Sequence, residues 1–318
     1  MAASGAAFAQ SSVTISGKLR YAYETAEKTA SGVVSKASGL RVTDGDVNFA
    51  AVEDLGGGLK ATAAIAVLTR GRDTGISSRD ASLSLAGNFG SVMIGSVEAG
   101  NGIIGLGGAG APVYGMDGSV IAGAGNVDII KYTSPAFNGF TLSANATDAT
   151  AAGANTLGMS GTAATADTTG FGVNYANGPL SAAADVTNYG LNASGGTSDS
   201  RTRISASYDL GVAKLGLGHQ VAKTTTGSKT KDMIMGVSVP VGAFVLGANY
   251  ATQQTDSGVK VKGTDLGAQY NLSKRTFIAA HYQKVTNRTA ALGSETYTAV
   301  TAAGNSNNKF RVQLSHAF

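Results

Sequence analysis

The chain has 318 residues, of which only 14% are charged and 45 are glycine, and it contains no cysteine or tryptophan. A typical soluble domain is about 25% charged, and a disordered chain is highly charged and poor in β-branched and aromatic residues, so both classes fit poorly. Four prolines and the lack of a Gly-X-Y repeat exclude collagen, and no apolar run approaches the ~18 residues of a membrane-spanning helix.

The absence of cysteine removes thiolate metal sites, disulfides and cysteine nucleophiles. The histidines His219, His281 and His316 are scattered and form no ligand pair at the usual spacing. The formal net charge of +4 is mild and forms no run of lysine or arginine, so nucleic acid is not an expected partner. We therefore expect neither a metal site nor a bound cofactor.

The first residues of the chain resemble the end of a secretory signal. They are small and apolar, and Ala7-Phe8-Ala9 fits the A-x-A cleavage pattern. We expect residues 1–9 to be a residual signal-peptide end on an exported protein, with the mature chain beginning near Gln10. A flexible alanine-rich terminus is the alternative interpretation.

The dominant pattern from Val13 onward is a period of two. In the first segment one parity is apolar and the other is polar or charged: Val13, Ile15, Leu19, Tyr21 and Tyr23 against Thr14, Ser16, Lys18, Arg20 and Glu24. The segment around Ile204 and the last segment, which ends in Phe318, alternate in the same way. Because successive side chains of a strand point to opposite faces, each segment predicts a strand with one apolar face.

Sixteen such strands are expected, centred near residues 18, 47, 63, 83, 93, 130, 142, 173, 183, 205, 216, 235, 247, 266, 281 and 313. Tight turns are expected at 56–58, 88–90, 138–139, 177–179, 210–211 and 240–242, and longer connections near 25–39, 70–78, 98–126, 148–167, 190–200, 223–230, 252–259 and 288–307. Short turns at one end and long loops at the other predict an all-β fold, a 16-stranded antiparallel transmembrane β-barrel with short periplasmic turns and long extracellular loops. A soluble sandwich would alternate similarly, but it would need to bury large side chains, whereas many of these strands carry Gly, Ala, Ser or Thr.

Several stretches carry a family resemblance when their order and spacing are taken together. They are Ser12–Ile15, Glu53–Ala61, Gly87–Gly95, Lys131–Phe140, Ser207–Leu215, Leu272–Thr276 and the closing Phe318. In these stretches the chain resembles the trimeric general porins of Gram-negative bacteria, most closely the β-proteobacterial type. The resemblance implies a single barrel domain over residues 10–318, a homotrimer with one water-filled pore per subunit, and a third long loop, about 98–127, that folds inward. It also implies that Phe318 is read by the barrel-assembly machinery.

Charged residues of lumen parity are candidates for the pore lining, because a charge on the lipid face near the membrane centre costs ~2–4 kcal/mol. The cations are Lys18, Arg20, Lys60, Lys131, Arg201, Arg203 and Arg311, with Asp46 and Glu24 opposing them. Glu98 and Asp117 are the acids expected at the inward loop. Each residue could instead be a solvated lumen residue with no role in selectivity.

The family's arginine ladder, by the same resemblance, falls on Ala50, Ser96 and Lys131, of which only Lys131 is charged. The loop that would face it is nearly free of charge. We therefore expect a weakly selective channel with a tilt towards anions, contributed by Lys18, Arg20 and Lys131.

Two local motifs suggest other chemistry but lack the context that it needs. Gly105–Gly110 matches G-x-G-x-x-G, yet a dinucleotide fingerprint must open a helix inside a βαβ unit, and no amphipathic helix is expected here. Asp44-Gly45-Asp46 offers too few oxygens for an EF-hand loop, although calcium between loop carboxylates stays open. No serine is marked as an activated nucleophile, so no catalytic residue and no enzyme activity are expected.

The sequence thus predicts a transport protein of the cell outer membrane, exported through the periplasm, that lets small hydrophilic solutes and ions diffuse passively. Its expected partners are copies of itself, outer-membrane lipid and lipopolysaccharide, and the assembly machinery. A substrate-specific channel is the first alternative, and a surface adhesin or structural barrel is the second.

Overall fold

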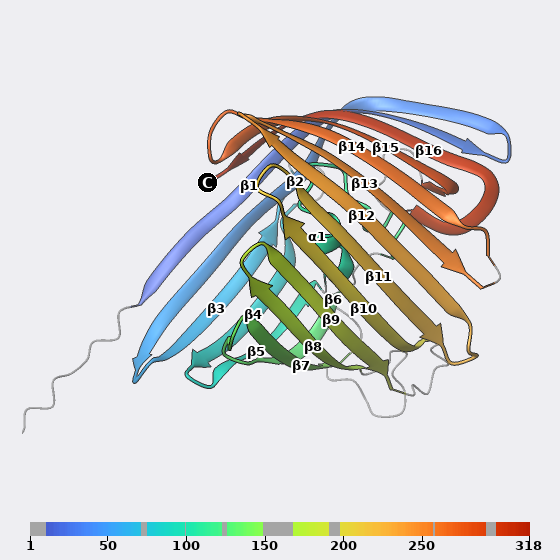
Figure 1. The fold of residues 1–318 in the computed structure, drawn as a ribbon. Coiled ribbons are helices and arrows are strands. Elements are labelled where there is room, and N and C mark those ends of the chain that lie inside the picture. Colours follow the sequence, from blue (N-terminus) through green and yellow to red (C-terminus); the bar gives the residue numbers. More distant parts are fainter. Residues whose placement is uncertain are drawn as a thin grey trace, which may run out of the picture.

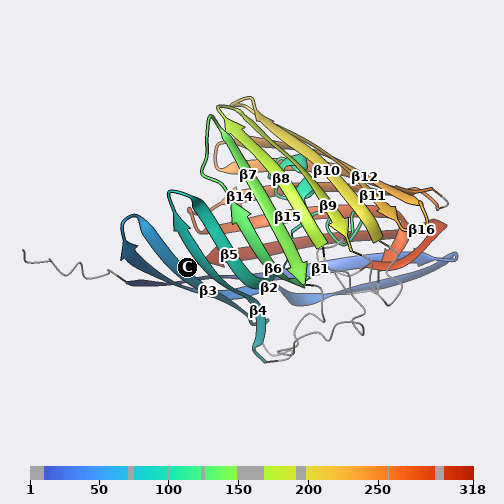
Figure 2. The same ribbon diagram turned by 90° about the horizontal axis from the view of Figure 1, so that it is seen from below.

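Sixteen antiparallel strands close into a barrel in which β1 pairs with β16 and every other strand pairs with its neighbours in sequence (Figures 1 and 2). This computed structural model describes residues 11–70, 75–98, 100–122, 126–148, 168–190, 198–256, 258–290 and 297–318. The strands are β1 (Ser12–Ala30), β2 (Val33–Gly56), β3 (Leu59–Leu68), β4 (Ser77–Gly87), β5 (Gly90–Glu98), β6 (Asn126–Thr133), β7 (Phe140–Asp148), β8 (Thr168–Asn177), β9 (Leu180–Tyr189), β10 (Ser198–Asp209), β11 (Lys214–Thr224), β12 (Lys229–Val241), β13 (Phe244–Thr255), β14 (Val261–Asn271), β15 (Thr276–Ala290) and β16 (Tyr297–Ala317). The predicted barrel and its strand number are confirmed.

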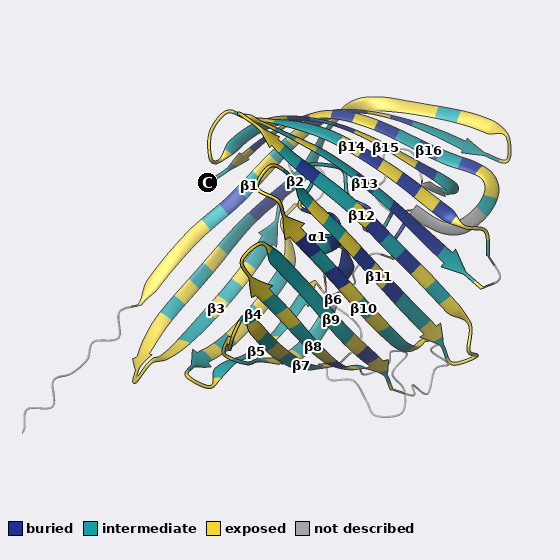
Figure 3. Ribbon diagram, viewed as in Figure 1, coloured by how far each residue is buried: buried dark blue, intermediate teal, exposed yellow. Residues whose placement is uncertain are grey.

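Burial alternates along the strands, as the period of two predicts (Figure 3). On β1 the outward side chains of Leu19, Tyr21 and Tyr23 are 44%, 48% and 50% exposed, whereas Ala22 and Glu24 are buried inside. This inverts the pattern of a soluble core, because the large apolar side chains are the exposed ones. Such a surface suits lipid, which solvates apolar side chains but offers no partner for backbone hydrogen bonds. Within the described residues, no helix is long and apolar enough to cross a membrane.

Two of the short turns show how the strands of a hairpin are connected. Asn138 and Gly139 have φ angles of 48° and 84°, the left-handed pair typical of a two-residue hairpin turn. Ser31 and Gly32, at 49° and 82°, form the same kind of turn at the tip of the β1–β2 hairpin. The long connection expected at 25–39 is therefore wrong, since strand pairing continues to Ala30 and Val33.

The long connection expected at 288–307 is wrong for a similar reason. β15 continues to Ala290 and β16 begins at Tyr297, so both strands extend past the segment predicted for them. The β1–β2 and β15–β16 hairpins reach well beyond the neighbouring strands at the upper right of Figure 1. The segments 25–39 and 288–307 contain few large apolar residues, so their sequences lack the hydrophobic alternation that marks a membrane-spanning strand. These residues are Val33, Val34, Leu292, Tyr297 and Val300.

The barrel closes at the C-terminus around Phe318. The backbone N–H of Gly17 donates to the carbonyl of Phe318 at 3.0 Å, and the N–H of Phe318 donates back to Gly17 at 3.0 Å. The Phe318 ring lies where a side chain at residue 17 would project, within 2.5 Å of that position. Glycine at position 17 is therefore needed for the terminal aromatic ring to pack on β1.

Candidate functional site: the lumen and its inward loop

The described residues between β5 and β6, 100–122, are called loop 3 here and fold into the lumen. It contains the short helix α1 (Gly102–Gly107), which packs against β10, β11 and β12 inside the ring of strands (Figures 1 and 2). Asn101 caps the helix by accepting from the N–H of Ile103 at 3.3 Å, and its side-chain amide donates to the carbonyl of Ala122 at 3.0 Å. The second bond ties the start of loop 3 to its end. The expected inward fold of this loop is thus present in the described residues.

Glycines on the lumen face of the wall make room for loop 3. A Cβ on Gly216 would lie 2.6 Å from the carbonyl oxygen of Gly107, and a Cβ on Gly218 would lie 2.7 Å from that of Ile103. Further glycines stand under the loop on the next three strands: Gly236 on β12, Gly247 on β13, and Gly263 and Gly267 on β14. The backbone of loop 3 therefore rests directly on the barrel wall, at a distance that only glycine permits.

An apolar cluster fills the space between loop 3 and the wall. From the loop it includes Ile103, Met116, Val120 and Ile121, and from the wall Ile234, Ala251, Val261 and Val285, all at most 1% exposed. Arg288 of β15 lies beside this cluster and donates to the carbonyls of Ser119 and Val120 at 3.2 and 3.1 Å. Burial of these side chains fixes the loop to β10–β15, and so the passage must lie on the loop's other side.

The tip of loop 3 is held by a carboxylate of β14. The N–H groups of Tyr114 and Gly115 donate to the two oxygens of Asp265, at 3.2 and 2.8 Å. Gln283 of β15 donates to the carbonyl of Gly115 at 2.8 Å. The Tyr114 hydroxyl reaches Glu24 of β1 at 3.1 Å. These contacts anchor the tip to three strands on the same side of the barrel.

Two expected lumen cations, Arg311 and Arg203, are engaged with neighbouring groups. The guanidinium of Arg311 stacks 4.0 Å from the ring of Tyr114, and its Nε donates to His281 at 3.1 Å. Arg203 contacts both carboxylate oxygens of Asp185 at 2.8 and 2.9 Å, beside Gly102 at the start of α1. Both arginines have the lumen placement that was expected, but they support loop 3 and its surroundings.

Asp265 gives the first test of this anchor. We expect Asp265→Asn to weaken docking of the loop tip by ~3 kcal/mol, because an amide has one acceptor oxygen where the carboxylate has two charged ones. Single-channel recordings should then show frequent brief changes of conductance that the parent protein lacks. Gln269→Ala is the matched control, since Gln269 lies on the lumen side of the same strand and bonds to Asn271 instead of loop 3. Steady conductance in D265N would contradict the anchoring role.

A balanced charge network lies on β1, β2, β4 and β5. Lys18 contacts Asp44 and Asp46 at 2.8 and 3.0 Å, and Arg20 contacts Asp44 at 3.4 Å. Arg79 joins Asp46 at 2.8 Å to Glu98 at 3.0 Å. The network thus holds three cations (Lys18, Arg20, Arg79) and three carboxylates (Asp44, Asp46, Glu98), a formal sum of zero. Sequence reasoning missed Arg79 as a lumen residue and gave Asp44 no role in the pore.

The exposed groups of this network are mainly its cations. The side chains of Lys18, Arg20 and Arg79 are each 33% exposed, whereas those of Asp44 and Asp46 are 16% and 7% exposed. Glu98, at the end of β5, is the one carboxylate of the three that is well exposed. Solvent ions passing this part of the wall therefore meet ammonium and guanidinium groups in front of the two aspartates.

Arg201 shares the inward parity of Arg203 on β10 and lies opposite Thr187 of β9. The other two expected cations, Lys60 and Lys131, lie on strands that loop 3 does not cover. Lys131 pairs across the sheet with Met93 and Asn145 and lies between outward Ile130 and Tyr132, so its side chain faces the lumen. Lys60 lies near the start of β3 and is exposed. Within the described part of the chain, neither lysine has a carboxylate within salt-bridge distance.

The positions expected for an arginine ladder are only partly on the lumen side. Ala50 and Lys131 have lumen parity, because their neighbours Phe49 and Ile130 are exposed on the outer face. Ser96 has the parity of Ile94, which is 56% exposed, and β5 shows no register shift between them. The expected placement of Ser96 on the inner wall is therefore wrong. Asp117, the other acid expected in the loop, is exposed and its backbone bridges to Ile121.

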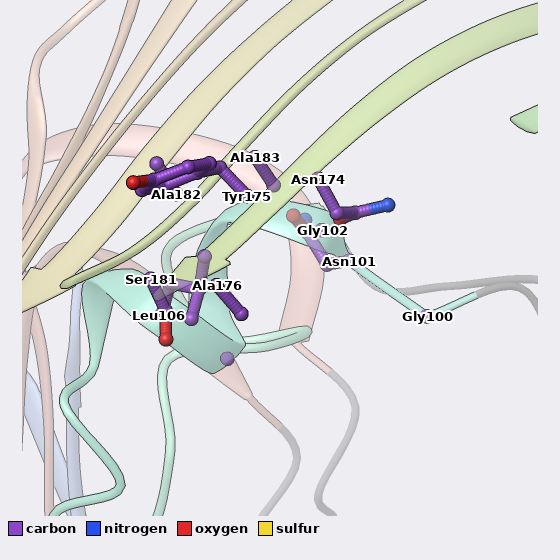
Figure 4. A pocket seen from close by; sticks show the side chains of 11 residues that line it. Gly100, Asn101, Gly102, Leu106, Asn174, Tyr175, Ala176, Ser181, Ala182 and Ala183 are labelled. Carbon is purple, nitrogen blue, oxygen red and sulfur yellow. The ribbon is translucent and has the colours of Figure 1, made fainter. Parts of the chain in front are cut away.

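A pocket of about 450 Å³ lies between α1 and the lumen side of β8 and β9 (Figure 4). Asn101, Gly102 and Leu106 line it from the loop, and Asn174 and Ser181 line it from the strands. The lining contains no charged side chain. This is space that loop 3 leaves open beside the wall, and it can hold water or a small polar solute.

The G-x-G-x-x-G match at Gly105–Gly110 does have a helix beside it, contrary to the expectation. The helix α1 begins at Gly102 and ends inside the motif at Gly107, so the glycines close a helix instead of opening one. The flanking strands β5 and β6 pair antiparallel. No βαβ unit surrounds the motif, and the geometry of a dinucleotide fingerprint is therefore missing from this part of the chain.

Comparisons with known proteins agree with this architecture. The sequence profile of a family described as "Gram-negative porin" matches residues 1–290. "Outer membrane porin protein 32" of Delftia acidovorans is 32% identical over an alignment that covers 100% of this chain and 97% of that protein. The solved structure described as "Anion-selective porin from Comamonas acidovorans" has a TM-score of 0.75 at 28% identity, covering 97% of this chain and 100% of that one. The trimer form of OmpT from Vibrio cholerae shares the fold, with a TM-score of 0.67 at 16% identity and coverages of 97% and 99%.

Proposed function

Since the chain belongs to the Gram-negative porin family, we propose that its outer-membrane diffusion channel favours anions mildly, through lumen lysines and arginines on the wall that loop 3 leaves uncovered. The channel lets small hydrophilic solutes diffuse passively, as in the family to which the chain belongs.

The position of the Lys131 side chain is the main support for this proposal. It faces the lumen from β6, and no carboxylate in the described residues lies within salt-bridge distance of it. The selectivity of a wide pore follows the charge that lines it, so an unpaired ammonium raises the local anion concentration. Lys60 adds to this effect near the periplasmic end, and the exposed cations of the balanced network add a smaller contribution. A relative of similar fold over its whole length is described as anion-selective, which supports the same sign.

Lys131→Gln tests the proposal because it removes one charge and keeps a polar side chain of similar length. We expect the chloride-to-potassium permeability ratio, taken from reversal potentials across a salt gradient, to fall by about twofold in dilute salt and much less in 1 M salt, where the screening length is ~3 Å. Lys274→Gln, in the exposed periplasmic turn after β14, is the control for loss of one positive charge. Cation preference in the parent protein, or an unchanged ratio in K131Q, would refute the role of Lys131.

Assembly is the second part of the proposal. The channel forms a homotrimer, as the described trimer of a relative with the same fold suggests. The outward faces of β1 and β16 at the barrel closure carry large side chains, among them Leu19, Tyr21, Val312 and Leu314. An interface there would bury aliphatic and aromatic surface.

Three further features fit an outer-membrane porin: the terminal Phe318, the lack of catalysis and the first residues of the chain. Phe318, whose ring packs on Gly17 at the barrel closure, is the terminal aromatic residue that the barrel-assembly machinery recognises. The barrel catalyses no reaction, in keeping with relatives that are channels. Residues 1–9, the proposed end of a signal peptide, lie outside the described residues.

A further inference from the structure

The pocket beside α1 continues into a group of charged side chains on the lumen wall. Ala183 lines the pocket from β9, and Asp185 follows two residues later on the same inward face of that strand. Arg203 of β10 lies directly opposite Asp185 in the β9–β10 register and is bonded to it. Gly102 of α1 lines the pocket and also lies beside the Arg203 guanidinium. An uncharged cavity and a charged group are therefore next to each other.

This charged group, called the charged corner below, consists of Arg201, Arg203 and Asp185. Arg201 faces inward from β10, two residues before Arg203. In the part of the chain that the structure describes, no carboxylate lies within salt-bridge distance of Arg201, and its Nε has no hydrogen-bond partner. The Arg203 Nη1 also lacks a partner among these residues. The corner thus carries one positive charge more than its carboxylate balances, and no hydrogen bond fixes the Arg201 guanidinium.

Asp185 gives the corner an accessible negative group. Its side chain is 25% exposed, whereas that of Arg203 is 13% exposed, so the carboxylate is the more accessible partner of the ion pair. The two oxygens accept from the Arg203 Nε at 2.8 and 2.9 Å, and a carboxylate has about four acceptor sites in total. The corner can therefore accept from an ammonium group while its guanidinium groups donate to a carboxylate.

The pocket itself suits an uncharged part of a solute. Its volume of about 450 Å³ lies within the ~300–1,000 Å³ range of small-molecule sites. Leu106, Ala176 and Ala183 provide carbon surface, and Asn174 and Ser181 provide the polar groups (Figure 4). A charged group placed in this pocket would lose water without gaining a charged partner, which is unfavourable. The charged end of a bound solute should therefore lie in the corner and its apolar end in the pocket.

From this juxtaposition we infer that the pocket and the charged corner together bind a zwitterionic solute with an uncharged tail, namely an α-amino acid such as leucine. The carboxylate of the solute bonds to the guanidinium groups of Arg201 and Arg203, its ammonium bonds to Asp185, and its side chain enters the pocket. The inference rests on the outer-membrane channel proposed above, but not on its ion preference.

Other solute classes match the site less completely. A simple organic anion would pair with the arginines but would place its charge close to the exposed carboxylate of Asp185, with no ammonium between them. An uncharged sugar would use neither charge. The zwitterion satisfies both signs at once, and charge-assisted hydrogen bonds are stronger than those between neutral groups. Binding should be weak, because a site beside the passage of a channel must also release its solute.

Ligand-observed saturation-transfer NMR, with the purified full-length protein in detergent, measures such weak binding. L-Leucine carries both charges, 4-methylpentanoate lacks the ammonium, and 3-methylbutylamine lacks the carboxylate, while all three share one branched tail. We expect each analogue to bind about fivefold more weakly than L-leucine, because it loses one charge-assisted contact. Glycine keeps both charges but has no tail, and it should bind about tenfold more weakly.

Two variants test the corner and the pocket separately. Arg201→Gln should raise the Kd of L-leucine about fivefold, because it removes the cation that has no carboxylate partner. Ala183→Leu should fill the pocket, and so raise the Kd of L-leucine about fivefold while leaving that of glycine unchanged. Lys60→Gln is the control: it removes a lumen cation of β3, which does not line the pocket, and should bind L-leucine like the parent protein. Insertion of open channels into bilayers shows that each variant is folded.

Three results would overturn the inference. These are an equal Kd of L-leucine for the parent protein and R201Q, equal binding of L-leucine and its two analogues, or binding of glycine as tight as that of L-leucine. Absence of any L-leucine binding to the parent protein would do the same. None of these results bears on the proposed channel function, because conductance and reversal potential are measured separately in bilayers without amino acids.

Discussion

Replacing Gly216 and Gly218 by valine should raise the single-channel conductance about twofold. The valine side chains would occupy the space in which the backbone of loop 3 now packs against the barrel wall. The new side chains would meet loop backbone: the Gly107 carbonyl and the Ala109 nitrogen lie 2.6 and 2.8 Å from a Cβ at Gly216. Backbone atoms cannot rotate away as a side chain can, and overpacking of this kind costs ~1–3 kcal/mol at each site. Either the wall or the loop must therefore move.

We expect loop 3 to move, and the barrel wall to keep its position. Each wall strand is held by ladders of hydrogen bonds to two neighbours, and the ring of strands is closed. Loop 3 is held by its apolar cluster, by Asp265 at its tip, and by a few side-chain contacts. Displacing α1 from β11 would expose Ile103 and loosen that cluster, so the loop should lift from the wall at its helical end.

Gly105→Val is the matched control for this experiment. It places the same side chain on α1 at a position where a Cβ has no heavy atom within 4 Å. Because the new side chain would project into open lumen, conductance should stay the same or fall slightly. A fall of conductance in G216V/G218V would mean that the loop moves into the passage, and no change would mean that the loop does not limit the current.

The membrane-spanning part of each strand could be predicted from the sequence because lipid imposes the pattern. One face must be apolar wherever hydrocarbon touches it, so the period of two is present between the interfaces and fades beyond them. The β1–β2 hairpin shows where it fades: its outer part pairs Glu27 with Lys36 at 2.9 Å, in a polar stretch that looked like a loop. Backbone pairing continues there although the hydrophobic signal has ended.

The inward direction of the charged residues was also predictable, but their partners were not. Lys18 and Asp46 share lumen parity, and that follows from the alternation alone. Arg79 has the parity of outward Leu83, and only a register shift between β3 and β4, near Ile65, turns its side chain to the inner network. A bulge of this kind changes which face a residue occupies without any signal in hydrophobicity.

The anchor of loop 3 was beyond the reach of sequence reasoning for a different reason. Tyr114 and Asp265 are 151 residues apart, and neither has a neighbour in sequence that marks it. Their contact depends on the path of the loop across β10–β14, which depends in turn on glycines scattered over four strands. In the sequence, each of those glycines cannot be distinguished from any other small residue of a strand.

Converting Asp44 and Asp46 to asparagine should give the largest change of ion selectivity, an increase of about fivefold in the chloride-to-potassium permeability ratio in dilute salt. The network of Lys18, Arg20 and Arg79 would keep Glu98 as its one carboxylate, so its formal charge would change from zero to +2 (three cations minus one anion). Asparagine retains an acceptor oxygen for the lysine and the arginines, which keeps the packing of the wall. The cations are already the more exposed partners, and so the uncovered charge would face the passage directly.

A control double variant with two Asp→Asn substitutions at the periplasmic turns distinguishes the effect of charge near the network from the effect of the total charge of the protein. Asp54→Asn and Asp209→Asn also remove two negative charges, and each aspartate accepts a turn N–H, from Gly56 and Gly211, that asparagine can still accept. We expect this control to move the reversal potential little, because the turns lie outside the narrow part of the channel and are screened within ~10 Å at 0.1 M salt. Equal shifts in the two double variants would show that overall charge sets the preference. A shift confined to D44N/D46N would show instead that the two aspartates hold this part of the pore near neutrality by cancelling the charge of Lys18, Arg20 and Arg79.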